Sequence, residues 1–307
     1  MMTNLVVIVG PTAVGKTETG ITLAKNLNGE IISGDSMQVY RGMDIGTAKV
    51  TEEEMEGIPH YLIDIKDPLE SFSVAEFQQR AKEYIQTIHD KNKLPLIVGG
   101  TGLYVNSVIY DYDFSKSEGD EAFREELENY ANQYGNEALH EKLKEIDPVS
   151  YKELHPNNVR RVIRALEVFH LTGKTIGERP QQPVTSPYNT IIVGLTMERE
   201  KLYERINLRV DMMVKEGLIE EAERLYNQGI HDCQSVQAIG YKEIYEYLRG
   251  DVSKEEAIET LKRNSRRYAK RQLTWFRNKM DITWFDMTKD RKKKVREINH
   301  FVEGKLF

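Results

Sequence analysis

The segment GPTAVGKT at residues 10–17 matches the phosphate-binding pattern G-x-x-x-x-G-K-[ST]. It follows an apolar run at 5–9 and precedes a helical stretch, which is the context in which this pattern binds phosphates. Glycines let backbone N–H groups converge on phosphate oxygens, a lysine neutralises charge, and a hydroxyl can ligate Mg²⁺. We therefore predict a diphosphate or triphosphate site, with Mg²⁺ as cofactor and Thr17 as its ligand. The predicted loop consists of Gly10, Pro11, Thr12, Ala13, Val14, Gly15, Lys16 and Thr17.

Two polar side chains follow other apolar runs and are candidates for the same site. The run at 30–33 ends in Gly34 and Asp35, and the run at 94–98 ends in two glycines and Thr101. The carboxyl ends of strands in a doubly wound sheet open on one crevice, so Asp35 and Thr101 are expected near the phosphate loop. A purely structural role, as a cap or turn residue, stays open for both.

The elements that must position these residues alternate between strand and helix. Apolar runs at 5–9, 30–33, 60–63, 94–98 and 190–193 predict strands, and helical patterns lie between them. One helix is expected over 73–89, where Ser73 followed by Glu76 resembles a capping box. This alternation predicts an α/β fold with a doubly wound parallel sheet, similar to the P-loop NTPases.

Residues 114–187 interrupt this alternation with amphipathic helical patterns and no convincing strand. The stretch begins in the polar segment SKSEGDE and ends in RPQQPVTSP. We predict a helical insertion domain there, with residues 1–113 and 188–307 forming the core. After Gly194 the chain is expected to be helical to near its end.

Charge is unevenly distributed along the 307 residues. The whole chain has 43 Lys and Arg against 49 Asp and Glu, a net charge of −6, which alone argues against a nucleic-acid partner. Residues 251–307, however, carry 16 basic and nine acidic residues, a net +7, and residues 1–250 carry −13. The segment LKRNSRRYAKRQLTWFR at 261–277 holds seven cations and no acid. Five of these cations share one helical stripe: Arg263, Arg266, Arg267, Lys270 and Arg271.

Such a stripe of one sign favours a polyanionic partner, although a solvated basic face backed by packed aromatics remains open. The apolar run at 5–9 is far shorter than the roughly 20 residues of a membrane span, so no membrane partner is expected. Cys233 is the single cysteine, which excludes an internal disulfide and indicates a reducing, cytoplasmic location.

Eight ordered blocks resemble the tRNA dimethylallyltransferases, also called isopentenyl-diphosphate:tRNA transferases, over nearly the whole chain. The single cysteine leaves no zinc-finger pattern, so the bacterial type of this family is favoured. The blocks are GPTAVGKT (10–17), SGDSMQVYRGMDIGTAK (33–49), IPHYLID (58–64), LIVGGTGLY (96–104), HPNNVRRVIRALEV (155–168), GLIEEAERL (217–225), QAIGYKE (237–243) and YAKRQLTWFR (268–277).

The resemblance implies transfer of a dimethylallyl group from dimethylallyl diphosphate to the exocyclic N6 amine of the adenine on the 3′ side of the anticodon. It implies Asp35 as general base, Thr101 near the reacting amine, and Lys16 and Arg124 on the diphosphate. An i,i+4 pair with Glu128 is the structural alternative for Arg124. The implied contacts to the tRNA anticodon stem-loop are Asp35, Ser36, Met37, Gln38, Asn158, Arg160, Arg161, Arg164, Gln237, Gly240, Lys242, Arg267, Lys270 and Arg271.

Three alternatives to the tRNA prenyltransferase stay open. A prenyltransferase acting on free adenine nucleotide would leave 261–277 without a role, and a kinase would use the basic helix for regulation. A non-enzymatic RNA-binding ATPase would leave Asp35 and Thr101 with structural roles only. The sequence leaves open the prenyl donor range, the tRNAs used, ATP as a ligand of the loop, and the oligomeric state, for which a monomer is expected. Packing between domains is the alternative for the contact regions around Asn158 and Gln237.

Overall fold

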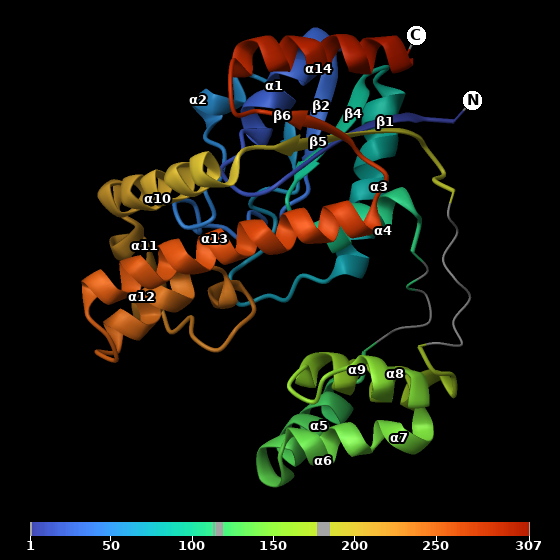
Figure 1. Cartoon of the computed structure of the whole chain (residues 1–307), viewed down its shortest axis with the longest axis vertical. Helices are drawn as coiled ribbons and strands as arrows, with labels where there is room; N and C mark the ends of the chain where they lie inside the picture. The colour runs from blue at the N-terminus through green and yellow to red at the C-terminus, as the bar shows by residue number, and fades with distance from the viewer. Residues whose placement is uncertain (1, 113, 115–118, 177–184, 307) are drawn as a thin grey trace. The chain divides into compact units, whose positions relative to one another are not determined.

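The chain divides into two compact units in the computed structural model, which describes residues 2–112, 114, 119–176 and 185–306 (Figure 1). Unit 1 comprises Met1–Asp111 and Thr185–Phe307, and unit 2 comprises Tyr112–Val184. Most of SKSEGDE and most of RPQQPVTSP, which mark the expected bounds of the insertion, lie outside the described residues.

Unit 1 is built on a six-stranded sheet in which every neighbouring pair of strands is parallel. The spatial order β3-β2-β4-β1-β5-β6 places β1 at the centre, with the phosphate-loop segment leaving its carboxyl end. This confirms the predicted α/β fold with a parallel sheet. The strands are β1 (Asn4–Val9), β2 (Gly29–Ser33), β3 (His60–Tyr61), β4 (Leu94–Gly99), β5 (Asn189–Thr196) and β6 (Thr283–Asp286).

Strand β6 corrects the expectation that the chain is helical from Gly194 to near its end. It lies at the sheet edge and, among the described residues, pairs with β5 alone, through Val193↔Thr283 to Thr196↔Asp286. Its four residues are half-buried or exposed, so they lack the continuous apolar run that predicted the central strands.

Side chains of β1 alternate between two cores, one on each face of the sheet. Val6 and Ile8 pack on the face covered by α1 and α14, whereas Leu5, Val7 and Val9 pack on the face covered by α3 and α4. Because both faces are covered, the strand is apolar throughout rather than alternating with polar residues. The helices of unit 1 are α1 (Lys16–Asn26), α2 (Glu52–Met55), α3 (Val74–Asp90), α4 (Gly102–Ile109), α10 (Arg199–Glu216), α11 (Leu218–Asn227), η1 (Ser235–Gln237), α12 (Tyr241–Leu248), α13 (Lys254–Lys279) and α14 (Arg291–Leu306).

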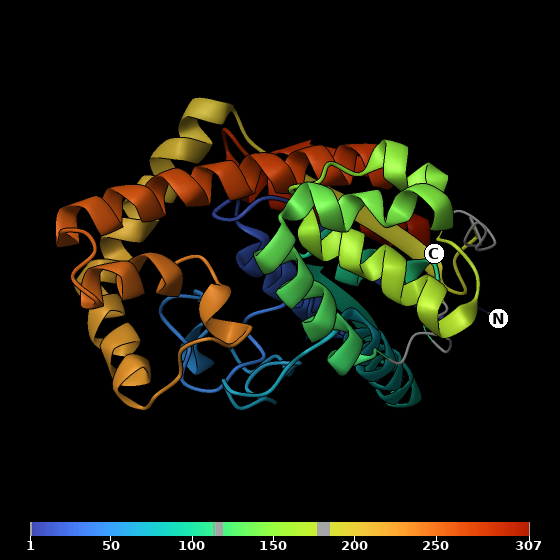
Figure 2. The same ribbon diagram turned by 90° about the horizontal axis from the view of Figure 1, so that it is seen from below.

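Helix α13 is the longest of the described helices and runs across unit 1 (Figure 2). It carries the residues of the predicted basic stripe. Ser253 begins it with a capping box to Glu256. Its buried side, which includes Leu261, Ala269 and Phe276, packs against α10, α12 and α4. The opposite side is therefore left for the cations. In the part of the chain that the structure describes, no helix combines the length and apolar composition needed to cross a membrane.

Unit 2 has its own small hydrophobic core, which includes Leu139, Leu143 and Val162. Its described residues form helices and no strand. These helices are α5 (Glu121–Tyr134), α6 (Asn136–Glu141), α7 (Leu143–Ile146), α8 (Pro148–Glu153) and α9 (Val159–Thr172).

Candidate active site

The loop at residues 10–17 joins β1 to α1 and contains three backbone positions with positive φ, at Gly10, Ala13 and Gly15. Gly15 has a φ of 106° at the start of α1, and a Cβ there would lie 2.5 Å from Nη2 of Arg291. Ala13 has a φ of 64°, and its carbonyl accepts a hydrogen bond of 2.9 Å from Nε of Arg205. Lys16 folds back, with Nζ donating to the Pro11 carbonyl at 2.8 Å. Arg205, from outside the motif, therefore supports the loop, and Arg291 lies close to Gly15 while its guanidinium pairs with Glu18 of α1.

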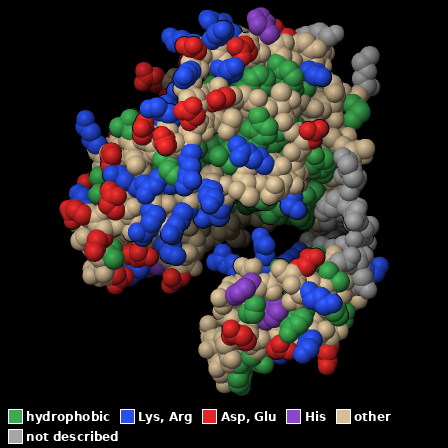
Figure 3. Space-filling model, viewed as in Figure 1, with side chains coloured by type: hydrophobic (Ala, Val, Ile, Leu, Met, Phe, Trp, Pro, Cys, Tyr) green, Lys and Arg blue, Asp and Glu red, His purple; other side chains and the backbone are tan. Residues whose placement is uncertain are grey.

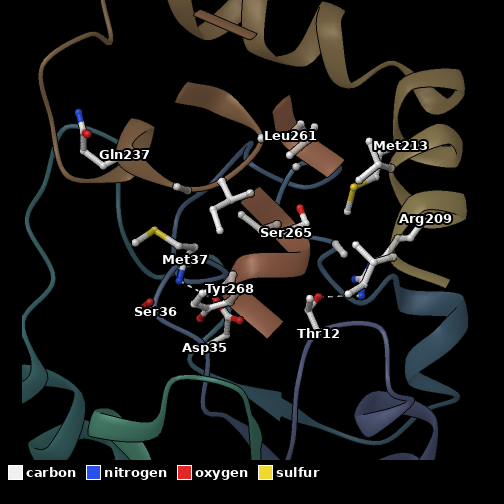
Figure 4. A pocket seen from close by; sticks show the side chains of 18 of the residues that line it. Thr12, Asp35, Ser36, Met37, Arg209, Met213, Gln237, Leu261, Ser265 and Tyr268 are labelled. Atoms are coloured by element: carbon white, nitrogen blue, oxygen red, sulfur yellow. Dashed lines mark hydrogen bonds between the residues drawn. The ribbon is translucent and has the colours of Figure 1, made fainter. Parts of the chain in front are cut away.

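A cavity of about 320 Å³ lies beside this loop (Figure 4). Thr12, Asp35 and Arg209 supply polar groups to it. Apolar walls come from α10, which places Ile206, Val210 and Met213 on one side at helical spacing, and from Leu261 of α13. The cavity thus combines a cationic and carboxylate region with an apolar one, as a ligand with a charged head and a hydrocarbon tail requires.

Positive charge is concentrated where the phosphate loop meets α10. Nη1 of Arg209 lies 3.5 Å from Oγ1 of Thr12, at the limit of a hydrogen bond. Burial, followed by the nearby positive charge of Arg209, lowers the pKa of Lys16 to about 8, although the carboxylate of Asp35 opposes this shift. Burial likewise lowers the pKa of Arg209 below its ordinary value. An anion bound here would relieve the repulsion between the two cations.

The predicted pair Asp35 and Thr101 lies on two adjoining turns that share hydrogen bonds. Oδ1 of Asp35 accepts from the Met37 N–H at 2.8 Å, and Oγ1 of Thr101 accepts from the Ser36 N–H at 3.1 Å. Asp35, Ser36 and Met37 all line the cavity. Asp35 therefore has the structural role that was kept open, but only one of its oxygens is used by it.

The remaining residues that were expected to contact tRNA in the segments 35–38 and 237–242 are of two kinds. Some line the cavity, and others support it or lie away from it. Gln237 and Gly240 line the cavity. Gln38 does not: its amide donates to the carbonyls of Thr47 and Ala48 and accepts from the Ser33 hydroxyl. Lys242 is exposed on α12 and is not among the cavity residues.

Glu221 of α11 attaches the segment after Asp35 to the C-terminal helices. Its carboxylate accepts hydrogen bonds of 2.9 Å from the backbone N–H groups of Asp44, Ile45 and Gly46. It also accepts from the Tyr241 hydroxyl at 2.6 Å and is only 8% exposed. Within the QAIGYKE block, Tyr241 thus packs inside unit 1, whereas Gln237 and Gly240 line the cavity.

The cations of the basic stripe on α13 differ in their surroundings, because some bond to neighbouring side chains and others are exposed. Arg266 is half-buried and donates to Asn207 of α10 at 2.6 Å, and Arg263 donates to the Thr260 hydroxyl. Arg267, Lys270 and Arg271 are exposed. With Thr274, Trp275, Asn278 and Lys279 they line an open groove, and Figure 3 shows Lys and Arg side chains gathered over α13. Arg271 lines both this groove and the cavity, so the two are adjacent.

Tyr268, Gln272 and Arg209 are candidate site residues that our sequence reasoning did not assign. Tyr268 lines the cavity, where burial and the negative charge of Asp35 raise its pKa to about 12. Gln272 accepts from the Thr12 N–H at 2.9 Å. The block YAKRQLTWFR contained the first two, but its cations drew the functional assignment. Arg209 lies in a long amphipathic stretch, and no local sequence pattern indicates which part of the fold that helix packs against.

The predicted site residues of unit 2 are placed only relative to that unit. Arg124 does not pair with Glu128 at i+4: its Nε lies 2.6 Å from Oε1 of Glu167, a fully buried carboxylate of α9. Arg164 pairs with the same carboxylate, and these hydrogen bonds help to lower the pKa of Glu167 against the effect of burial. Arg160, Arg161 and Asn158 are exposed, and Asn158 begins α9 without a side-chain cap.

For a metal, the described residues contain no group of three or more His, Cys, Asp or Glu side chains arranged as ligands. The side chain of Thr17 is exposed in the first turn of α1, and its hydroxyl has no hydrogen-bond partner among the described residues. This fits Mg²⁺, which keeps several waters and is commonly held by few protein groups together with substrate phosphates.

Comparison with known proteins gives one consistent result. Residues 38–279 match the family model described as IPP transferase. The chain is 65% identical over 309 residues to the tRNA dimethylallyltransferase of Halalkalibacterium halodurans, covering all of this chain and 98% of that protein. The crystal structure of the full-length tRNA isopentenylpyrophosphate transferase from Bacillus halodurans matches with a TM-score of 0.76 and 64% identity, covering 99% and 96% of the two chains. A eukaryotic dimethylallyltransferase acting on tRNA matches with a TM-score of 0.83 and 31% identity, covering 98% of this chain and 80% of that one.

Proposed function

Because the chain belongs to the IPP transferase family of tRNA dimethylallyltransferases, we propose that it transfers the dimethylallyl group of dimethylallyl diphosphate to the N6 amine of the adenine 3′-adjacent to the anticodon in tRNA. The observation that carries the proposal is the cavity in which Thr12 of the phosphate loop, Asp35 and Arg209 meet an apolar wall. In a diphosphate ester of a short hydrocarbon, the diphosphate matches the polar region of this cavity and the hydrocarbon matches its apolar wall.

In this reaction the bond between N6 and C1 of the dimethylallyl group forms while the bond between C1 and the diphosphate oxygen breaks. The departing diphosphate gains negative charge, which the loop N–H groups, Lys16 and Arg209 stabilise. Arg209 adds a cation that the sequence analysis did not assign, and Arg124 remains a further proposed contact to the diphosphate. The hydrocarbon lies against Val210 and Met213.

The N6 amine is a poor nucleophile because its lone pair is delocalised into the adenine ring. Asp35, whose second oxygen is free of the turn hydrogen bond, accepts the N6 proton as general base. Thr101, with its hydroxyl bonded to the same turn, keeps this carboxylate next to the amine. The adenine must leave its stack to reach this position, and the cavity residues Ser36, Met37, Gln237 and Gly240 surround it.

The anticodon stem-loop is held by the exposed cations beside the cavity. Arg267, Lys270 and Arg271 contact phosphates and Trp275 offers a stacking surface in the same groove. Asn158, Arg160, Arg161 and Arg164 of unit 2, together with Lys242, complete the proposed contacts. Gln38 supports them from behind, because its amide holds the backbone of the cavity residues Thr47 and Ala48. The proposal includes a monomer, because one chain supplies every proposed group, and a cytoplasmic location, where tRNA is available.

Mg²⁺ bound by Thr17 and the diphosphate would neutralise charge on the leaving group. Thr17 contributes its hydroxyl from the first turn of α1, where the helix N-terminus already favours anions.

The test is transfer of label from radiolabelled dimethylallyl diphosphate to a tRNA transcript with an unmodified adenine beside the anticodon. We expect labelled N6-isopentenyladenosine in the digested tRNA, and none when guanine replaces that adenine. Absence of transfer to the adenine-bearing transcript would refute the proposal.

Two parallel assays address the alternatives. AMP offered in competition with tRNA should remain unlabelled, whereas preferential labelling of AMP would indicate an adenine-nucleotide prenyltransferase. Phosphate transfer from γ-labelled ATP to any acceptor would favour a kinase, and we expect none.

A further inference from the structure

Gln272 of α13 connects the phosphate loop to the turn that carries Thr101. Its Oε1 accepts a hydrogen bond of 2.9 Å from the Thr12 N–H, and its Nε2 donates a hydrogen bond of 3.0 Å to the Gly100 carbonyl. The residue is only 6% exposed, so water competes little for these bonds. One buried side chain therefore holds two backbone segments that lie far apart in sequence.

The connection continues from this turn to the proposed general base. Gly100 precedes Thr101, whose hydroxyl oxygen accepts from the Ser36 N–H. Ser36 follows Asp35, and the Asp35 carboxylate accepts from Met37 in the same turn. A path of hydrogen bonds and peptide links thus connects the loop proposed to hold the leaving group with the carboxylate proposed to receive the proton.

We propose that Gln272 is a positioning residue that fixes the separation between the phosphate loop and Asp35. The inference rests on the proposed prenyl transfer, in which C1 must lie between the diphosphate oxygen and N6. Reacting atoms need to approach to about 3–3.5 Å, and a misplacement of about 1 Å can cost about a hundredfold in rate. Gln272 acts through the two loops, so its loss affects the chemical step more than the affinity for either substrate.

Gly100 provides an independent way to disturb the same contact. A Cβ at this position would lie 2.3 Å from Nε2 of Gln272, and its nearest contact to another residue would be Gly10 O at 3.6 Å. Gly100→Ala therefore displaces the Gln272 amide from the Gly100 carbonyl without meeting any other group closely. When Gln272 is shortened, the added methyl group has room.

The experiment measures single-turnover transfer from a preformed complex with tRNA and dimethylallyl diphosphate, for Gln272→Met, Gln272→Ala, Gly100→Ala and the double variant Gly100→Ala/Gln272→Ala. Each single variant should lower the rate about 10- to 100-fold while the Kd values for tRNA and diphosphate change less than about threefold. Adding Gly100→Ala to Gln272→Ala should change the rate less than about threefold, because the contact is already lost. Gln79→Met, on the exposed side of α3, is the matched control and should leave all three quantities unchanged.

Three results would overturn the inference: an unchanged rate in Gln272→Met, additive losses in the double variant, or losses of affinity as large as the losses of rate. Thermal melting of each variant separates these outcomes from a failure to fold, and the nearly isosteric Gln272→Met keeps the core volume. If the unsubstituted protein transfers no dimethylallyl group, the proposed function fails. If it does and the losses are additive, only the role of Gln272 fails.

Discussion

At the scale of single residues, Asp35 combines a turn hydrogen bond with a place in the cavity, and two substitutions separate these roles. Asp35→Asn keeps an oxygen that can accept from the Met37 N–H but cannot accept a proton at neutral pH. We expect single-turnover transfer to fall by roughly 10²–10⁴-fold in Asp35→Asn, with tRNA affinity unchanged. Asp35→Ala should show the same loss of rate and a lower melting temperature. Equal losses of tRNA affinity and rate in Asp35→Asn would contradict the role as base.

Lys16 carries a second prediction, which concerns pH. Its ammonium is charged below its pKa of about 8 and neutral above it, so the attraction for a diphosphate declines as the pH rises through 8. Because diphosphate itself titrates in this pH range, the Kd for inorganic diphosphate is compared with that of Lys16→Arg, which stays charged throughout. We expect the ratio of the two Kd values, measured by calorimetry, to be nearly constant from pH 6.5 to 7.5 and to rise between pH 8 and 9.5. A ratio that does not change with pH would argue against Lys16 as a diphosphate ligand.

Some site residues could be predicted from the sequence and others could not, depending on the element that carries them. Lys16, Asp35 and Thr101 follow predicted strands, so the rule that strand ends meet at one edge locates them. Arg209 and Gln272 project from helices, and their positions depend on how α10 and α13 dock against the sheet. Arg124 shows the same dependence, because its partner is Glu167 of another helix rather than Glu128 of its own.

At the scale of elements, the central strands were predictable because burial on both faces makes them continuous apolar runs. Strand β3 ends earlier than the run at 60–63, because Leu62 has a φ of 62°, which leaves the extended conformation. Strand β6 was missed because a half-exposed edge strand of four residues has no such run. For α3, Ser73 caps the helix as expected, while the Glu76 side chain pairs with Lys66 and Arg80.

The exposed side of α13 predicts the salt dependence of tRNA binding. Each cation that contacts a phosphate contributes about 0.7–0.9 to the slope of log Kd against log salt concentration. Arg267→Ala/Lys270→Ala should weaken tRNA binding and lower this slope by about 1.5, measured by filter binding at several salt concentrations. Lys292→Ala/Lys293→Ala removes two exposed cations from α14 and is the matched control, expected to change the slope little. If both pairs change it equally, net charge rather than the groove governs binding.

At the scale of the whole molecule, the net charge of −6 conceals a body of −13 over residues 1–250 and +7 over residues 251–307. The acidic body favours solubility and disfavours indiscriminate RNA binding. Within the basic segment, the cations Arg267, Lys270 and Arg271 of α13 line the groove next to the cavity, whereas the cations of α14 line neither. RNA binding is therefore expected at α13 rather than over the whole basic segment.

The division into two units gives the last prediction. All six strands belong to unit 1, and unit 2 has a separate core, so replacing residues 112–184 by a flexible Gly/Ser linker should leave the sheet folded. We expect the shortened protein still to bind diphosphate through the 10–17 loop, with an affinity lowered only by the loss of the proposed contact from Arg124. Its tRNA affinity should fall at least about tenfold because the cations of α9 are lost. Its transfer rate at saturating tRNA should also fall, because Arg124 is absent.

Calorimetry measures the diphosphate affinity, filter binding the tRNA affinity, and single-turnover assays the transfer rate. Full tRNA affinity in the shortened protein would exclude unit 2 from RNA recognition.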